Sequence, residues 1–168
     1  MRTQAIRSAT RVTYDRGLMS DEGVDVEIGT ETDAQLEWVV ATRMGLTADF
    51  RGYDPTNMRL VHQDLETGEL APLPMYTEDI QAAVEVQIGL GYALEPDDSG
   101  PTRVWKAHRK GAPLSEAVSE NPARAIAMAV AREGQDQFIR VPRAMATQEQ
   151  IEAAEQRLNL PPEYPRQR

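Results

Sequence analysis

Four segments of this sequence have the apolar spacing of an amphipathic helix, and short strand-like segments lie between them. The helix-like segments begin near Thr32, Thr77, Asn121 and Thr147, which are all residues suited to cap a helix N-terminus. Two of the strand-like segments are joined as a hairpin, and helices separate the others, which is typical of antiparallel rather than doubly wound parallel sheets. The sequence therefore predicts an α+β fold, with helices packed on one face of a small antiparallel sheet.

Two of these helices carry the residue pair that forms a capping box at a helix N-terminus. Thr32 is followed three residues later by Gln35, and Thr147 is followed by Gln150. Asp33 is a rival cap one position after Thr32. Both helices are predicted to begin at these pairs.

The other two helices are marked by different signals. Asn121 is predicted as an N-cap with Pro122 at the first helical position, and Gly134 fits the left-handed position after the helix. Thr77 is predicted as the N-cap of the second helix. The apolar stripe expected on that helix consists of Ile80, Ala83, Val84 and Ile88.

Strands are predicted from alternation of apolar and polar residues, and residues 46–56 are expected to form a loop. The predicted strands are residues 24–28, 58–63, 92–95, 102–108 and 137–141. The order of elements divides the chain into three parts. These are a charged N-terminal arm (residues 1–31), an α+β sandwich-like core (32–134), and a C-terminal strand and helix with a Pro-rich tail (135–168).

Composition excludes several classes of protein. The 168 residues include no Cys, so neither a disulfide framework nor a cysteine-ligated metal site can form. A formal net charge of −9 argues against a dedicated nucleic-acid binder. No apolar run approaches the ~20 residues that span a bilayer, and the first residues lack a signal-peptide pattern, so we expect a cytoplasmic protein with no membrane partner.

Charge is unevenly distributed along the N-terminal arm. Four arginines and one aspartate give the first sixteen residues a net charge of +3, and seven acidic residues with no base follow from Asp21 to Glu37. The arginines are Arg2, Arg7, Arg11 and Arg16. The arm is either a solvated tail or a partner-binding segment that docks on an acidic surface, such as that of a neighbouring subunit.

A second basic cluster surrounds a tryptophan near the middle of the chain. It consists of Arg103, Trp105, Lys106, His108, Arg109 and Lys110. On a strand, alternate residues share one face, so Arg103, Trp105 and Arg109 are expected together. An aromatic ring flanked by guanidinium groups suits a nucleotide base and phosphate. The alternative is a charged edge strand that resists aggregation, with Trp105 in the core.

Other chemistries lack support in the residues. Only His62 and His108 could act as a base for a nucleophile, and neither lies in a known catalytic motif. The loop at Asp97–Gly100 lacks the ligand pattern of a calcium site, and Gly89–Gly91 follows a helix rather than a strand, unlike a phosphate-binding loop. We expect no catalytic residues, no metal site and no cofactor.

The middle of the chain resembles the phage ABA-sandwich domain family, found in uncharacterised bacteriophage proteins. The strongest match is Pro74–Ala83, where the family often shows Pro-x-Tyr-Ser-Thr-Asp-Ile-x-Ala-Ala. Met44-Gly45 and Asn121–Ile126 also match, although Leu46 stands where the family often has Trp. The resemblance covers about residues 33–133. It implies a small α+β core and a phage protein acting inside an infected bacterium.

These observations predict a non-enzymatic bacteriophage accessory protein, as a homo-oligomer in the cytoplasm of the infected host. Its expected partner is a host or anti-phage-defence component, either a protein or a small anionic nucleotide bound at the second basic cluster. The alternative is a structural or assembly protein of the virion that links subunits through its charged arms. A small enzyme acting on a nucleotide has only the basic cluster and scattered carboxylates in its favour.

Overall fold

The structure, a computed structural model, describes residues 23–46, 48–54, 59–63, 66–135 and 137–159. Its helices are α1 (Asp33–Arg43), α2 (Ile80–Leu90), α3 (Pro122–Arg132) and α4 (Gln148–Asn159), with a short 3₁₀ turn at Arg143–Met145. Its strands are β1 (Gly23–Glu27), β2 (Ala48–Asp54), β3 (Arg59–Gln63), β4 (Leu70–Pro72), β5 (Tyr92–Asp97), β6 (Val104–Arg109), β7 (Ala112–Ser119) and β8 (Phe138–Pro142).

The predicted α+β class is confirmed, and the strands divide among three small antiparallel sheets. Their orders are β1-β8, β2-β3-β4 and β5-β6-β7. In the two three-stranded sheets, strands that follow one another in the sequence pair with each other. Among the described strands, only β1 and β8 pair across a long stretch of the chain.

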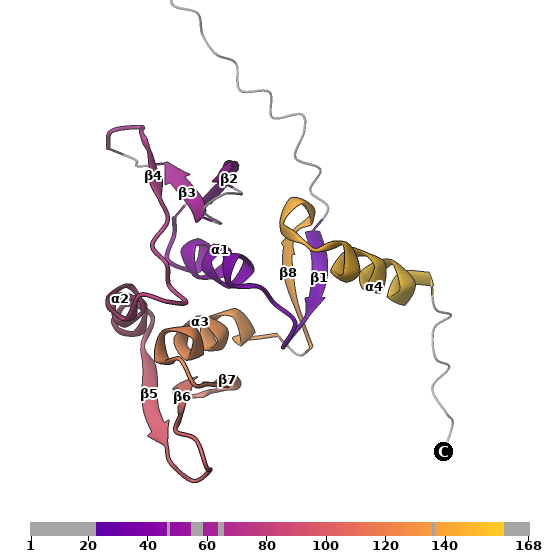
Figure 1. Ribbon diagram of the computed structural model, residues 1–168. Coiled ribbons are helices and arrows are strands. Elements are labelled where there is room, and N and C mark those ends of the chain that lie inside the picture. The colour runs from indigo at the N-terminus through magenta and orange to yellow at the C-terminus, as the bar shows by residue number, and fades with distance from the viewer. Residues whose placement is uncertain (1–22, 47, 55–58, 64–65, 136, 160–168) are drawn as a thin grey trace, which may run out of the picture.

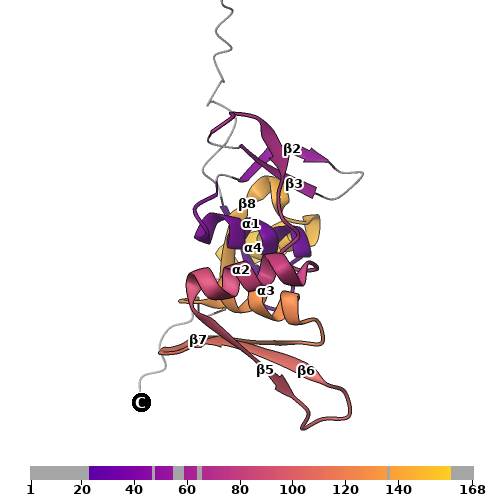
Figure 2. The same cartoon turned by 90° about the vertical axis from the view of Figure 1, so that its left-hand side faces the viewer.

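Helices α1 and α3 lie between the two three-stranded sheets, and α4 lies against β1. In Figure 1, α3 lies on the β5-β6-β7 sheet, α1 lies on the other side of α3, and β2-β3-β4 lies beyond α1. Figure 2 shows the same order from the side, with α2 facing the viewer. Each three-stranded sheet therefore has helices on one face.

The pairing of β1 with β8 joins the first described strand to the last one, more than one hundred residues later in the chain. Val24 lies opposite Val141, and Val26 lies opposite Ile139. All four side chains are buried in the hydrophobic core. Residues 23–27 of the expected arm and residues 138–142 of the expected C-terminal part are thus integral to the folded unit, because alternate residues of both strands bury an apolar face.

Helix α3 is the centre of the core. It contacts α1, α2 and strands of the β5-β6-β7 sheet. Its buried residues are Ala123, Ala125, Ile126, Ala127, Ala129, Val130 and Ala131. Small side chains on several faces let neighbouring elements approach closely, which is why an alanine-rich helix can be buried between a sheet and two helices.

The predicted ends of α3 are confirmed. Asn121 Oδ1 accepts a hydrogen bond from the backbone N–H of Ala123 at 2.9 Å, and Pro122 is the first helical residue. Gly134 has a φ of 73°, the left-handed conformation that Gly adopts without a Cβ clash.

Both predicted capping boxes are also confirmed. The Thr32 N–H donates to Gln35 Oε1 at 2.9 Å, and the Gln35 N–H donates to Thr32 Oγ1 at 3.3 Å. Thr147 and Gln150 form the same pair of bonds, at 2.9 Å and 3.2 Å. Asp33, the rival cap, is instead the first residue of α1 and forms an ion pair with Arg124.

The prediction for α2 was wrong at its N-cap and over most of its buried face. Asp79 is the N-cap, and its Oδ1 accepts from the Gln81 N–H at 2.8 Å. The helix buries Ala82, Ala83 and Val86 instead of the predicted stripe, of which only Ala83 is buried. Helix α2 packs against the alanine-rich α3, and its own small residues allow the closest approach.

The strand predictions were partly right. The hairpin of β5 and β6 is confirmed, as are the strands near residues 24–28, 58–63 and 137–141. The expected loop at residues 46–56 was wrong, since β2 occupies Ala48–Asp54, and the sequence analysis missed β4 and β7. These three strands lack clear alternation and are held by pairing with β3 or β6, which is a tertiary effect.

Candidate functional site

The structure does not gather the basic cluster around Trp105 into one site. Arg103 lies before β6, and its guanidinium forms two bonds to the Asp98 carboxylate, from Nε to Oδ1 at 2.6 Å and from NH2 to Oδ2 at 3.1 Å. Trp105 is half-buried and packs against the core on the same face as the buried Ala107. The alternation of β6 therefore directs Trp105 toward the core.

The next two members of the cluster lie on the opposite face of β6. Lys106 Nζ lies 3.6 Å from Glu116 Oε1 on β7. His108 is half-buried, and its Nδ1 lacks a hydrogen-bond partner among the described residues. The cations that sequence reasoning placed together thus occupy separate environments, and both Arg103 and Lys106 already have an acidic partner.

Arg109, at the end of β6, belongs to a different group of side chains centred on Glu133. Arg109 NH1 donates to Glu133 Oε1 at 2.6 Å, and the Tyr92 hydroxyl donates to Glu133 Oε2. Arg43 NH2 donates to the backbone carbonyl of Glu133 at 3.2 Å. This group, called the Glu133 cluster below, joins α1, β5, β6 and the end of α3.

Electrostatics stabilise the charge state of the Glu133 cluster. The hydrogen bond from Tyr92 and the one from Arg109 hold the pKa of the Glu133 carboxyl below its ordinary value. Burial and the hydrogen bond to Glu133 raise the pKa of the Tyr92 hydroxyl. At neutral pH the carboxylate stays ionised and the phenol stays protonated, so the pair links elements rather than exchanging a proton.

A groove lies beside the Glu133 cluster, between α1, the end of α3 and β8. Its volume is about 210 Å³. Its lining residues are Trp38, Val39, Thr42, Arg43, Ala131, Gln135, Ile139 and Arg140. Two of these are arginines and none is acidic, in a chain with a net charge of −9. No local sequence pattern marks this groove, because its walls come from two segments far apart in the chain, residues 38–43 and 131–140.

The outer face of α2 exposes an apolar stripe. Ile80, Val84 and Ile88 are 44 %, 37 % and 77 % exposed. Their i, i+4, i+8 spacing aligns them along one side of the helix. We call these three residues the α2 stripe. The sequence signal for it was present, but the periodic residues face solvent instead of the core.

The α2 stripe lies in an acidic part of the sequence. Glu78, Asp79 and Glu85 are the charged residues between Leu73 and Gly91. From residue 60 to residue 102 the sequence contains nine acidic residues and neither Lys nor Arg. The helix therefore presents apolar side chains among carboxylates.

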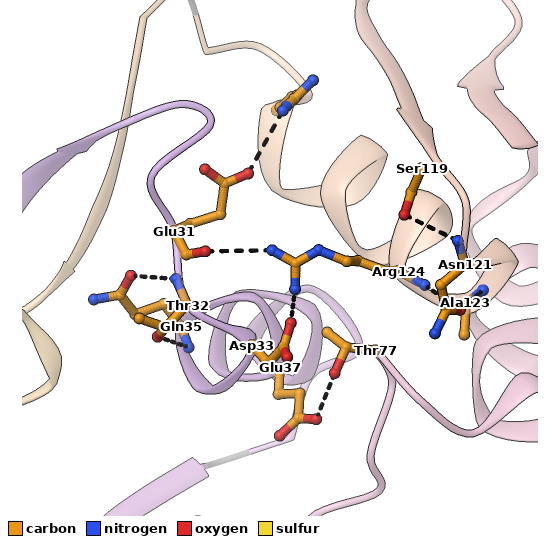
Figure 3. A network of polar contacts seen from close by, with 11 residues as sticks. Glu31, Thr32, Asp33, Gln35, Glu37, Thr77, Ser119, Asn121, Ala123 and Arg124 are labelled. Carbon is orange, nitrogen blue, oxygen red and sulfur yellow. Dashed lines mark hydrogen bonds and ion pairs between the residues drawn. The ribbon is translucent and has the colours of Figure 1, made fainter. Parts of the chain in front are cut away.

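Charged residues at the junction of α1 and α3 bind one another (Figure 3). Arg124 NH2 donates to the Glu31 carbonyl at 3.4 Å and its NH1 pairs with Asp33, while Arg132 NH2 lies 3.6 Å from Glu31 Oε1. Glu31 is buried. These contacts tie the start of α1 to α3, which gives the charges a structural role.

Buried Glu37 contributes to another tie between helices. The Thr77 hydroxyl donates to Glu37 Oε1 at 3.0 Å, and both residues are buried. Thr77 precedes α2, and Glu37 lies on α1 (Figure 3). The contact explains why Thr77 does not cap α2.

Comparison of the chain with family models, curated proteins and solved structures found no significant match. The resemblance to the phage ABA-sandwich domain family therefore stays a prediction. Within the described ranges, no group of three or more His, Cys, Asp or Glu side chains could hold a metal ion. No helix in the part of the chain that the structure describes is long and apolar enough to cross a membrane.

Some predicted sites fall on residues outside those that the structure describes. These are the partner-binding arginines Arg2, Arg7, Arg11 and Arg16, and the Pro-rich tail from residue 160 onward.

Proposed function

We propose that this protein is a non-enzymatic bacteriophage accessory protein that binds another protein in the cytoplasm of the infected bacterium. The phage setting rests on the family resemblance of residues 33–133. The binding role rests on the α2 stripe. Anti-phage defence components and other host proteins are the partner classes that this setting offers.

The observation that carries the proposal is the exposure of three aligned aliphatic side chains on α2. Single exposed apolar residues are common, but a row of them on one helix is typical of a docking surface. Ile88 is 77 % exposed, so most of its side chain contacts water in the free protein. Covering the row would remove this apolar surface from water, which favours association by about 25 cal/mol per Å².

The acidic surroundings define the chemistry of the partner. Glu78 and Glu85 are exposed and lie on or next to α2. A partner segment with aliphatic residues spaced at i and i+4 and flanked by Lys or Arg would match both the stripe and the carboxylates. We therefore propose a basic amphipathic segment of a second protein as the occupant.

The Glu133 cluster is not a candidate acid–base pair. Glu133 and Tyr92, whose pKa values are shifted, are bonded to each other. A general acid or base needs a proton that it can exchange near neutral pH. Neither member of this pair meets that condition.

Site-specific photo-crosslinking tests the proposal. The full chain is expressed during infection with benzoylphenylalanine in place of Val84. The cells are irradiated, and the crosslinked peptides are identified by mass spectrometry. The control places the same group at Val118, an exposed residue of β7 with 43 % exposure. We expect a crosslink from position 84 to a basic amphipathic segment, and its loss when Ile88→Glu is added.

Two results would contradict the proposal. A crosslink from position 84 to a second copy of this chain would make α2 a self-association surface. The same crosslinks from positions 84 and 118 would show that α2 has no specific partner. The alternative function, a virion component, predicts the chain in purified phage particles at a fixed copy number, which mass spectrometry measures.

A further inference from the structure

The groove between α1, α3 and β8 combines an aromatic wall with two cations. Trp38, on α1, lines the groove. It is half-buried, because part of its side chain packs against the hydrophobic core. Arg43 and Arg140 line it from α1 and β8. Aromatic rings stack on a tryptophan face, and guanidinium groups bind phosphate through paired hydrogen bonds.

Arg43 is available to a ligand. Its NH2 donates a hydrogen bond to the backbone carbonyl of Glu133 at 3.2 Å, and it forms no ion pair with a carboxylate of the described residues. The nearby Glu133 carboxylate accepts one hydrogen bond at each oxygen, from Tyr92 and from Arg109. Arg43 is close enough to Glu133 to act on it electrostatically but does not form an ion pair with its carboxylate, so the Arg43 guanidinium can still bind an anion in the groove.

Arg140 can exchange its partner at little cost. Its NH1 lies 3.1 Å from Asp25 Oδ1, and the two side chains are 64 % and 52 % exposed. Ion pairs as exposed as this one contribute little to stability, because water and salt screen them. A phosphate at the rim of the groove can thus recruit Arg140 together with Arg43.

Gln135, on another wall of the groove, offers a polar contact for the edge of a heterocyclic base. The Gln135 side-chain amide forms no hydrogen bond with the described residues and lines the groove beside Ala131. An amide can both donate to and accept from a heterocyclic base. The groove has a volume of about 210 Å³, below the roughly 300 Å³ of the smallest typical ligand pockets. The groove is therefore too small for a whole nucleotide, and we place only the base inside it and the phosphate at its rim.

We infer that this groove binds a small nucleotide, with the base against Trp38 and the phosphate between Arg43 and Arg140. The site is separate from the basic cluster around Trp105, where the sequence placed such a ligand. It is also separate from the α2 stripe, so the inference does not depend on the proposed protein partner.

Binding is tested with the purified full chain carrying Trp105→Phe, so that Trp38 is the remaining tryptophan of the two in the sequence. Each of the four 5′-nucleoside monophosphates is titrated by isothermal calorimetry and by quenching of Trp38 fluorescence. Adenosine and inorganic phosphate are titrated separately as probes of the two halves of the ligand. The variants are Arg43→Gln and Arg140→Gln, and the matched control is Arg103→Gln, an exposed arginine outside the groove with its own acidic partner.

We expect saturable quenching by at least one nucleotide, and binding at least tenfold weaker for adenosine and for phosphate alone. Loss of one charged hydrogen-bond donor weakens binding by about tenfold or more, so Arg43→Gln should do so and Arg103→Gln should not. Circular dichroism of each variant checks that the fold is retained. Arg140→Gln provides a second test at a position too exposed to affect folding.

Three outcomes would overturn the inference. The first is no binding of any nucleotide at millimolar concentration. The second is binding unchanged by both Arg43→Gln and Arg140→Gln. The third is equal weakening by Arg103→Gln, which would place the ligand at the basic cluster or show a charge effect that is not specific to the groove.

Discussion

Gln35 and Gln150 exchange side-chain hydrogen bonds in the interior of the protein. Gln35 Nε2 donates to Gln150 Oε1 at 2.7 Å, and Gln150 Nε2 donates to Gln35 Oε1 at 3.3 Å. Each glutamine is also the N3 residue of a capping box, at the start of α1 or α4. One amide pair therefore joins two helix N-termini that lie 115 residues apart in the sequence.

Replacing Gln150 with Ala should destabilise the protein strongly. The change removes both hydrogen bonds between the two buried amides and leaves the Thr147 N–H without its partner, while Gln35 keeps its bonds to the Met145 carbonyl and the Thr32 N–H. Each lost buried hydrogen bond costs about 1–3 kcal/mol. We expect a decrease of about 2–4 kcal/mol in the free energy of unfolding, measured by urea denaturation. Gln148→Ala is the control, because that exposed residue bonds to Glu152 on the surface of the same helix. Equal effects of the two substitutions would rule out the buried pair as a stabilising contact.

Two valines of α2 provide a matched test of which face is buried. Val86 is 0 % exposed and Val84 is 37 % exposed, two positions away. Val86→Ala removes two buried methyl groups and leaves a cavity, so we expect a loss of about 2 kcal/mol. Val84→Ala should change the free energy of unfolding by less than about 0.5 kcal/mol. The reverse order in chemical denaturation would mean that α2 is rotated, with the sequence-predicted stripe facing the core.

Thr77 should stabilise the protein through its hydroxyl rather than as a helix cap. Thr77→Val keeps the shape but removes the donor to Glu37, leaving a buried carboxylate oxygen without that hydrogen bond. We expect a loss of about 1–3 kcal/mol in thermal or urea unfolding, and near-wild-type stability for Thr77→Ser. Asp79→Ala should cost about 1 kcal/mol by removing the N-cap. A neutral effect of Thr77→Val would contradict this assignment.

Stability should depend on pH through Glu133. The pKa of its carboxyl is lowered in the folded protein from its ordinary value of 4.5, chiefly by the hydrogen bond from Tyr92. The folded state therefore binds this proton less readily than the unfolded state. The stabilisation is present above pH 4.5 and is lost as the pH falls through the folded pKa.

The measurement is the melting temperature of the wild type and of Glu133→Gln at several pH values below 6. The wild type should lose more stability on acidification than the variant, which has no carboxyl at this position. Glu155→Gln is the control, because Glu155 pairs with Arg143 on the surface, with the two side chains 55 % and 44 % exposed. A variant whose pH dependence equals that of the wild type would show that Glu133 is not stabilised in its charged form.

The cations that are adjacent in residues 103–110 do not form one cluster in the structure, for a physical reason. Sequence reasoning can only group residues that are close in the chain, and it selected residues 103–110 because their cations are adjacent. The β pleat and local ion pairs separate those cations in the structure. The groove at Trp38 draws its walls from residues about one hundred positions apart, and no local pattern marks such a set.

The sequence pattern of α2 likewise did not predict which face of the helix is buried. Its periodicity correctly predicted a helix, but Ile80, Val84 and Ile88 face solvent and the smaller Ala82, Ala83 and Val86 face the core. Both faces of this helix carry apolar residues, so the pattern alone did not distinguish them. The choice depends on α3, whose alanine-rich surface accepts a close neighbour.

The sequence by itself determined the helix boundaries at Thr32, Asn121, Gly134 and Thr147, together with the α+β class. Caps depend on hydrogen bonds between residues two or three positions apart, so their energy is encoded locally. The tertiary structure alone decided the pairing of β1 with β8, the buried face of α2 and the walls of the groove. Each of these depends on surfaces contributed by distant segments, and their fit in three dimensions is not present in any short stretch of sequence.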